Sequence, residues 1–68
     1  MDRLLAMQVF ATVAECGSFT AAAERLDLSR AMATRHVESL EQWLGARLLH
    51  RTTRRVSLTD AGAQCLRY

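Results

Sequence analysis

Apolar residues in the middle of the chain recur at the spacing of one α-helical face. Those positions, separated by four, three and four residues, are Ala33, Val37, Leu40 and Leu44. The spacing predicts a helix between Ser29, a favourable N-cap, and Gly45, a common helix stop. Small and hydrogen-bonding side chains fall on the opposite face: Ala31, Thr34, Arg35, Glu38 and Gln42. Trp43 lies near the edge of the apolar stripe, and we expect it to be a partly buried packing residue.

The N-terminal segment is also helical by pattern, over residues 2–16, and Gly17 is suited to end it. It carries two apolar strips. The first strip consists of Leu4, Met7, Phe10 or Ala11, and Ala14, and the second of Leu5, Val9 and Val13. A helix with two apolar strips is either deeply buried or shared between a core and a partner subunit.

A short second helix is expected over residues 21–26, with Ser18 or Thr20 as its N-cap. Asp27 and Leu28 then form a tight turn, since Asp is among the residues that tolerate left-handed backbone geometry. Leu28 is expected to fill the space between the second and third helices. The short helix, the turn and the longer helix together predict a helix-turn-helix unit.

Beyond the third helix the pattern changes to strand-like alternation. Val56 and Leu58 alternate with polar neighbours, and residues 48–49 are apolar, so two short strands joined by residues 52–54 are predicted as a hairpin, or wing. Thr59 is a suitable cap for a final helix. The expected fold is mainly all-α: a winged helix-turn-helix of three core helices and a two-stranded wing over residues 1–58. Residues 59–68 are expected to begin a linker helix.

Length and composition indicate one small globular domain. The chain has 68 residues, half of them apolar, and its apolar runs are too short to span a membrane. No export signal is recognisable at its start, so a cytoplasmic protein is expected. Cys16 and Cys65 are isolated, and we expect both to remain reduced thiols.

Charge is distributed unevenly along the chain. Residues 1–41 carry four Arg against six acids, a balance of −2, whereas residues 42–68 carry five Arg against one acid, a balance of +4. No acid lies between Glu41 and Asp60, an interval that contains Arg47, Arg51, Arg54 and Arg55. Taken alone, such a basic cluster is equally compatible with nucleic-acid binding and with a solvated face.

The order of these motifs resembles the amino-terminal DNA-binding domain of LysR-type transcriptional regulators over essentially the whole chain. The residues that carry the resemblance are Phe10, Val13, Gly17, Ser18, Phe19, Thr20, Ala22, Ala23, Leu26, Leu28, Ser29, Arg35, Leu40, Glu41, Leu44, Gly45, Leu48, Leu49, Arg51, Arg54, Arg55, Val56, Leu58, Thr59, Ala61 and Gly62. The chain departs from the family at Arg30 and Ala31, where Gln-Pro is usual. Milder departures are Thr34 for Ser, His36 for Gln and Leu49 for a frequent Phe.

The resemblance implies sequence-specific binding of double-stranded DNA by a bacterial transcription regulator. It implies that the third helix lies in the major groove and the wing at the minor groove. Family members are homodimers or tetramers that bind interrupted palindromes, and they sense a small-molecule effector through a further domain absent from this sequence. Without a full linker helix, we expect this chain alone to be monomeric or weakly dimeric.

Ten residues are candidate DNA contacts: Ser18, Thr20, Ser29, Arg30, Ala31, Thr34, Arg35, Arg51, Arg54 and Arg55. Arg35 can bond bidentately to guanine, or it can simply pair with Glu38 three residues on. Thr34 can contact a thymine methyl or phosphate, or its hydroxyl can bond its own backbone. Arg54 suits a narrow minor groove at the wing tip, or it serves as edge-strand charge. Arg51 can instead hold the wing to the body.

An enzyme is not indicated. Cys16, His36, His50 and Cys65 share no metal-binding spacing, and the chain lacks a paired-carboxylate motif, a phosphate loop and a nucleophile elbow. These residues imply no cofactor. The alternative function is a winged helix that binds only proteins, because fold alone does not fix function.

Overall fold

The computed structural model describes residues 3–51 and 56–67, with backbone alone at positions 51 and 67. Its elements are α1 (Arg3–Cys16), α2 (Phe19–Arg25), α3 (Arg30–Leu44), β1 (Leu49–Arg51), β2 (Val56–Leu58) and α4 (Asp60–Arg67). The two strands pair antiparallel, with Leu49 opposite Leu58 and Arg51 opposite Val56. The predicted winged helix-turn-helix and its order of elements are therefore confirmed.

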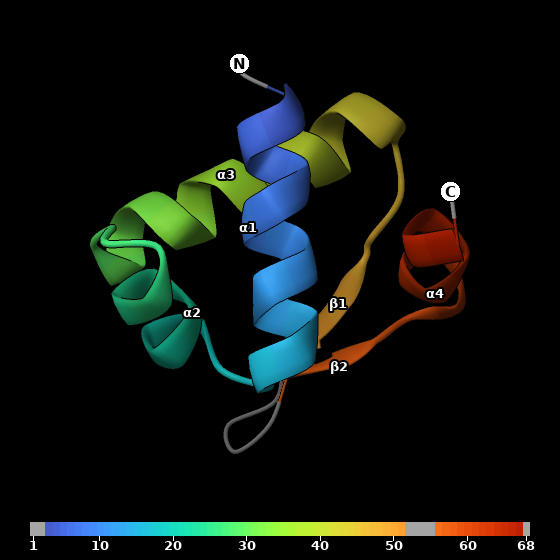
Figure 1. Cartoon of the computed structure of the whole chain (residues 1–68). Helices are drawn as coiled ribbons and strands as arrows, with labels where there is room; N and C mark the ends of the chain where they lie inside the picture. The colour runs from blue at the N-terminus through green and yellow to red at the C-terminus, as the bar shows by residue number, and fades with distance from the viewer. Residues whose placement is uncertain (1–2, 52–55, 68) are drawn as a thin grey trace.

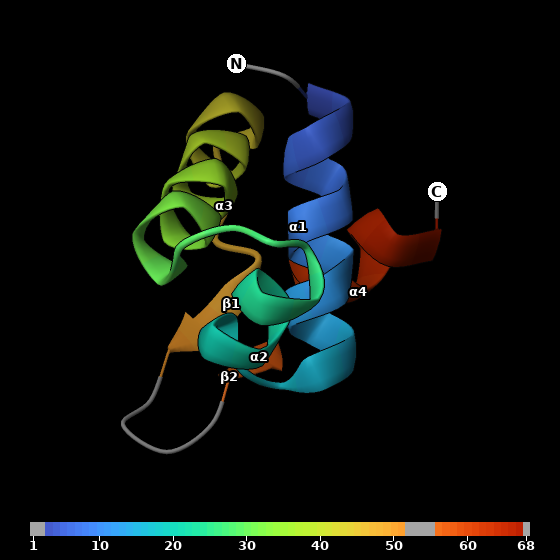
Figure 2. The same cartoon turned by 60° about the vertical axis from the view of Figure 1, so that its left-hand side comes forward.

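Helix α1 is the central element of the fold (Figure 1). Helix α3 lies on one side of it and α4 on the other, while α2 lies near its C-terminal end (Figure 2). The core consists of Ala6, Val9, Phe10, Val13, Phe19, Ala22, Ala23, Ala33, Val37, Leu40, Leu48 and Leu49. Alanine at four of these positions allows the three helices to approach closely, so a small chain still encloses an apolar core.

Only part of the two strips predicted on α1 forms its buried face, which also includes Ala6, a residue of neither strip. Ala6, Val9, Phe10 and Val13 are all inaccessible to solvent. The deeply buried alternative is wrong at Leu4, whose side chain is 73% exposed. A partner-facing strip that includes Val9 and Val13 is also excluded, since both are fully buried in the core of this chain.

The last turn of α3 departs from its predicted apolar face. Leu44 is 42% exposed, and Trp43 is 56% exposed, so Trp43 is partly buried as predicted, but both side chains lie outside the core. At this end of α3 the Trp43 ring lies against a cation of α1. The Arg3 guanidinium lies 4.8 Å from the centre of the Trp43 ring, within the range of a cation–π contact.

The turn between α2 and α3 has the predicted left-handed residue, Asp27, with φ of 58°. Leu28 N–H then donates to the Ala23 carbonyl at 2.8 Å, and the Leu28 side chain packs against the core. Helix α2 begins at Phe19, two residues earlier than predicted, because Ser18 is its cap and accepts from Ala21 N–H at 3.2 Å. The alternative cap, Thr20, is wrong: it lies exposed in the first turn of α2.

Candidate nucleic-acid interface

The N-terminal end of α3 is fixed by a side-chain cap. Ser29 has extended backbone geometry, and its hydroxyl accepts from Met32 N–H at 3.1 Å. This arrangement satisfies one of the backbone donors that the first turn of a helix leaves unpaired. The predicted cap is confirmed, and it makes Arg30 the first residue of the helix.

The outer face of α3, which we define as Arg30, Ala31, Thr34 and Arg35, is directed away from the core. Three of these side chains are exposed and Thr34 is half-buried. The Thr34 hydroxyl donates to the Arg30 carbonyl at 2.9 Å, as its backbone-bonding alternative predicted. The methyl group and the remaining lone pairs of Thr34 stay available for a ligand. The outer face therefore presents two guanidinium groups, with the small side chains of Ala31 and Thr34 between them in the sequence.

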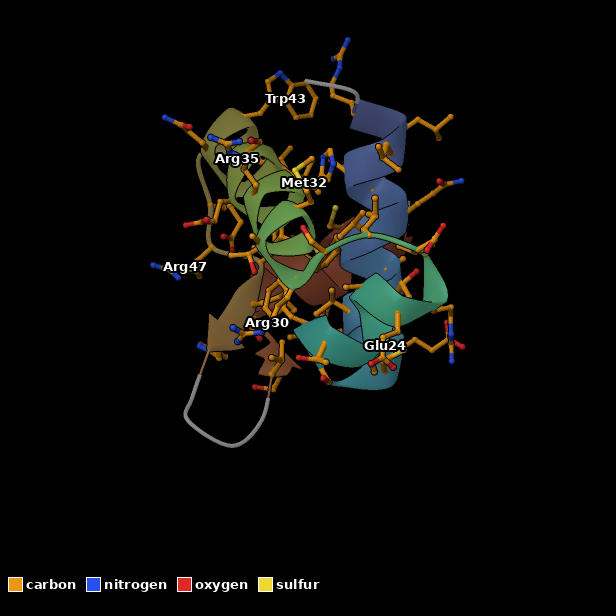
Figure 3. All side chains as sticks on the ribbon, turned by 90° about the vertical axis from the view of Figure 1, so that its left-hand side faces the viewer. Glu24, Arg30, Met32, Arg35, Trp43 and Arg47 are labelled. Atoms are coloured by element: carbon orange, nitrogen blue, oxygen red, sulfur yellow. The ribbon has the colours of Figure 1, made fainter. Side chains whose placement is uncertain are left out.

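Arg47 is a candidate that sequence reasoning left out of the site, although it belongs to the basic cluster of the C-terminal half. It is exposed and lies in the segment between α3 and β1. Figure 3 shows Arg30, Arg35 and Arg47 on the side of the molecule formed by α3 and its following segment, whereas Glu24 projects from α2. The absence of acids between Glu41 and Asp60 was the available signal for Arg47.

The remaining predicted residues come from other elements. Ser18 and Thr20 lie at the start of α2, where the Ser18 hydroxyl is engaged as the cap. Arg54 and Arg55 lie outside the described residues, and so does the side chain of Arg51. The strands that lead to residues 52–55 are described, and their register defines the base of the wing.

Glu41 connects α3 to the wing, a role that the sequence analysis did not recognise. Its Oε2 atom accepts from Leu48 N–H at 2.8 Å and from Leu49 N–H at 3.3 Å. Both leucines are almost completely buried, so their backbone donors need partners inside the protein. A carboxylate seven positions earlier supplies both, which no local helix or strand pattern reveals.

The same segment is held from the opposite side by the start of α4. Thr59 N–H donates to the Leu48 carbonyl at 3.0 Å, and the Thr59 hydroxyl donates to the Arg47 carbonyl at 2.5 Å. The predicted cap at Thr59 is confirmed, since its hydroxyl also accepts from Gly62 N–H at 3.0 Å. A Cβ at Gly62 would collide with the Leu48 carbonyl.

We call this set of residues the Leu48 junction. It consists of Glu41, Arg47, Leu48, Leu49, Thr59 and Gly62. Through it, the C-terminal part of α3, the first strand of the wing and the first turn of α4 meet at one backbone segment. A few hydrogen bonds and one close approach therefore join these three elements, in addition to the packing of Leu48 and Leu49 in the core.

The described residues show no arrangement suited to a metal. Within 3–51 and 56–67, the His, Cys, Asp and Glu side chains do not gather in groups of three. Cys16 and Cys65 are half-buried free thiols, and Cys65 Sγ lies 3.8 Å from Met7 Sδ. None of the helices in this part of the chain is long and apolar enough to cross a membrane.

Comparison with known proteins places residues 4–63 within the model of a family described as bacterial regulatory helix-turn-helix proteins of the lysR family. A curated relative from Xanthomonas campestris, an HTH-type transcriptional regulator, is 58% identical over 55 residues. That match covers 81% of this chain and 16% of the relative. The chain spans about a fifth or less of the length of the curated relatives it matches.

Solved structures agree closely with the fold. A crystal structure of the BenM DBD with catB site 1 DNA superposes with a TM-score of 0.90 at 34% identity, covering 100% of this chain and 74% of that one. Full-length CbnR complexed with its target DNA gives a TM-score of 0.90 at 40% identity, covering 98% of this chain and 23% of that one. Both similar proteins were crystallised with DNA.

Proposed function

The chain belongs to the lysR family of bacterial regulatory helix-turn-helix proteins, and from this premise we propose that it binds double-stranded DNA as the DNA-binding domain of a bacterial transcription regulator. The observation that carries the proposal is the outer face of α3. Its capped start and its exposed Arg30 and Arg35 match what a helix needs to enter the major groove. Similar chains that were crystallised with DNA support the same function.

In the proposed complex, the first turns of α3 lie in the major groove. Arg30 and Arg35 read guanine through its two acceptors, and the methyl of Thr34 contacts thymine. Ala31 allows the helix backbone to approach the base edges closely. Ser29 contacts a phosphate in addition to capping the helix.

The other contacts fix the position of the domain on the duplex. Arg54, which the sequence pattern predicts at the tip of the wing, is proposed to bind in the minor groove, where a narrow groove concentrates negative potential. Cationic and hydroxyl side chains from other elements are proposed to bind the phosphate backbone, and such contacts carry no base preference of their own. These phosphate-binding residues are Ser18, Thr20, Arg47, Arg51 and Arg55.

The intact regulator is proposed to act as a homodimer or tetramer on an interrupted palindrome, in the cytoplasm and without catalytic activity. Helix α4 is proposed to begin the linker that joins two such domains, and a small-molecule effector is proposed to bind a separate domain. One domain covers one half-site, so tethering two domains raises affinity for the palindrome. The 68-residue chain itself should sediment as a monomer or weak dimer at micromolar concentration, and a tight dimer would contradict this part of the proposal.

Selection of bound sequences from a random duplex pool tests the function directly. We expect enrichment of one half-site and protection of that site from nuclease, with affinity falling as salt rises. The matched control is the chain with Arg30→Ala and Arg35→Ala, which keeps the buried face of α3 intact. A chain that protects no duplex at low salt, while folded, would favour the alternative of a protein-binding winged helix.

A further inference from the structure

The C-terminal turn of α3 contains a carboxylate that the helix itself disfavours. Glu41 lies in the last turn, where the negative end of the helix dipole makes an anion unfavourable by a few tenths of a kcal/mol. An anion is also unfavourable near a surface that binds phosphate. The half-buried carboxylate nevertheless accepts from two consecutive backbone N–H groups, at Leu48 and Leu49.

These two hydrogen bonds act at the point where the wing leaves the body. Strand β1 begins at Leu49 and leads into residues 52–55. Its last residue, Arg51, follows Leu49 by two positions, or about 7 Å of extended strand. A tilt of about 10° at Leu49 would therefore displace this end of β1 by roughly 1 Å, which is enough to stretch a hydrogen bond to DNA beyond its usual range.

We propose that Glu41 is a positioning residue for DNA binding, because its carboxylate fixes the base of the wing relative to α3. This inference rests on the proposed function. Glu41 does not touch DNA; it holds Leu48 and Leu49 so that the outer face of α3 and the wing engage one duplex at the same time.

A pair of substitutions separates the reach of the side chain from its charge. Glu41→Asp keeps the charge but is shorter by one methylene, so it cannot span to both amides. Glu41→Gln removes the charge but keeps an acceptor oxygen at the same reach. Glu24→Gln, on the exposed surface of α2, is the matched control for the change in net charge.

Binding of each chain to a 25-base-pair duplex of mixed sequence is measured between 50 and 200 mM salt. We expect Glu41→Asp to bind more weakly with a salt slope shallower by about one to two units, because wing contacts to phosphate are lost. Glu41→Gln should keep the slope of the unsubstituted chain. Amide exchange at Leu48 and Leu49 should accelerate in Glu41→Asp and remain slow in Glu41→Gln.

A double-mutant cycle identifies the wing as the element that Glu41 positions. If Arg54 reaches the duplex only when the wing is held, Arg54→Ala should weaken binding in the unsubstituted chain and have little further effect beside Glu41→Asp. Additive effects would overturn the inference. So would a folded Glu41→Asp chain whose affinity and salt slope are unchanged, because Glu41 would then serve stability alone.

The remaining outcomes are equally decisive. Tighter binding by Glu41→Gln with normal binding by Glu41→Asp would assign Glu41 a purely electrostatic effect and overturn the inference. If Glu41→Asp does not fold, Glu41→Gln decides: retained slope and slow exchange support positioning, whereas fast exchange with unchanged binding contradicts it. No salt-dependent binding by the unsubstituted chain would overturn the proposed function itself, and this inference with it.

Discussion

The outer face of α3 and the Leu48 junction are built in opposite ways. The outer face consists of side chains that project from a helix already stabilised on its other side by Ala33, Val37 and Leu40. The junction consists of backbone groups that side chains from α3 and the start of α4 satisfy, with Gly62 placed against the Leu48 carbonyl. Side chains of the outer face can be replaced without steric conflict, whereas the Leu48 junction has little space for an added side-chain atom.

This difference predicts how substitutions separate stability from recognition. Changes on the outer face should alter which DNA is bound and leave the free energy of unfolding nearly constant, since surface substitutions away from special features have small effects. Changes at the junction should lower stability, because backbone atoms there cannot move aside. Four substitutions test the contrast, from the largest expected effect to the smallest.

Gly62→Ala should have the largest effect, lowering the free energy of unfolding by about 2–3 kcal/mol. The added methyl collides with a backbone carbonyl, and overpacking of this kind outweighs the gain in helix propensity. Urea denaturation measures the change. Ala63→Gly, at the exposed next position, is the control and should cost no more than about 1 kcal/mol. A Gly62→Ala chain as stable as the unsubstituted one would mean that α4 can shift freely on the junction.

Arg30→Gln should change base preference without changing stability. Arg pairs best with guanine and Gln with adenine, so one base pair per half-site should shift from G·C towards A·T, by roughly 1–3 kcal/mol of discrimination. Sequences selected from a random pool by the two chains give the comparison. An identical consensus, with weaker binding to every sequence, would instead place Arg30 on a phosphate.

Ser29→Ala tests a residue with both a structural role and a proposed recognition role, since Ser29 caps α3 beside the outer face. Loss of the bond to Met32 N–H should cost about 1 kcal/mol of stability. Ser29→Asp, which can also cap, should restore thermal stability and weaken DNA binding through repulsion of phosphate. Equal DNA affinity in the Ala and Asp variants, compared at matched folded fractions, would argue against a phosphate at this position.

Arg54→Ala should give the smallest effect. We expect uniformly weaker binding to all duplexes and a salt slope reduced by about one unit. The melting temperature should stay within experimental error of the unsubstituted chain. A lower melting temperature with an unchanged salt slope would show that Arg54 contributes to the stability of the fold and does not contact DNA.

The sequence predicts the fold well where the signals are local. Helical spacing located α1 and α3, and the caps at Ser29 and Thr59 and the left-handed turn at Asp27 were recognisable from residue type alone. Periodicity failed at Leu4 and Leu44, because burial at a helix end depends on what the neighbouring helix offers there. The contact between Arg3 and Trp43 joins the start of α1 to the end of α3, and no local pattern contains that information.

The residues of the candidate site likewise divide into those that local signals predict and those that only the three-dimensional structure reveals. The exposed residues of α3 could be assigned from the helical count, since orientation follows from the buried stripe. Glu41 could not, because its partners lie seven and eight positions away across a turn, and it resembles any polar residue beside an apolar stripe. Gly62 was noticed only as part of the family resemblance, and its close approach to Leu48 becomes visible in three dimensions alone.

The contact between Arg3 and Trp43 gives the protein an optical reporter. Trp43 is the only tryptophan in the chain, and it is partly open to solvent beneath a cation. At a rise of 1.5 Å per residue, it lies about 20 Å along α3 from Arg30. DNA seated on the first turns of α3 is therefore too distant to quench it by contact. A change in its emission during a DNA titration would report rearrangement between α1 and the end of α3, whereas constant emission would show that this end of the helix stays unchanged when the other binds.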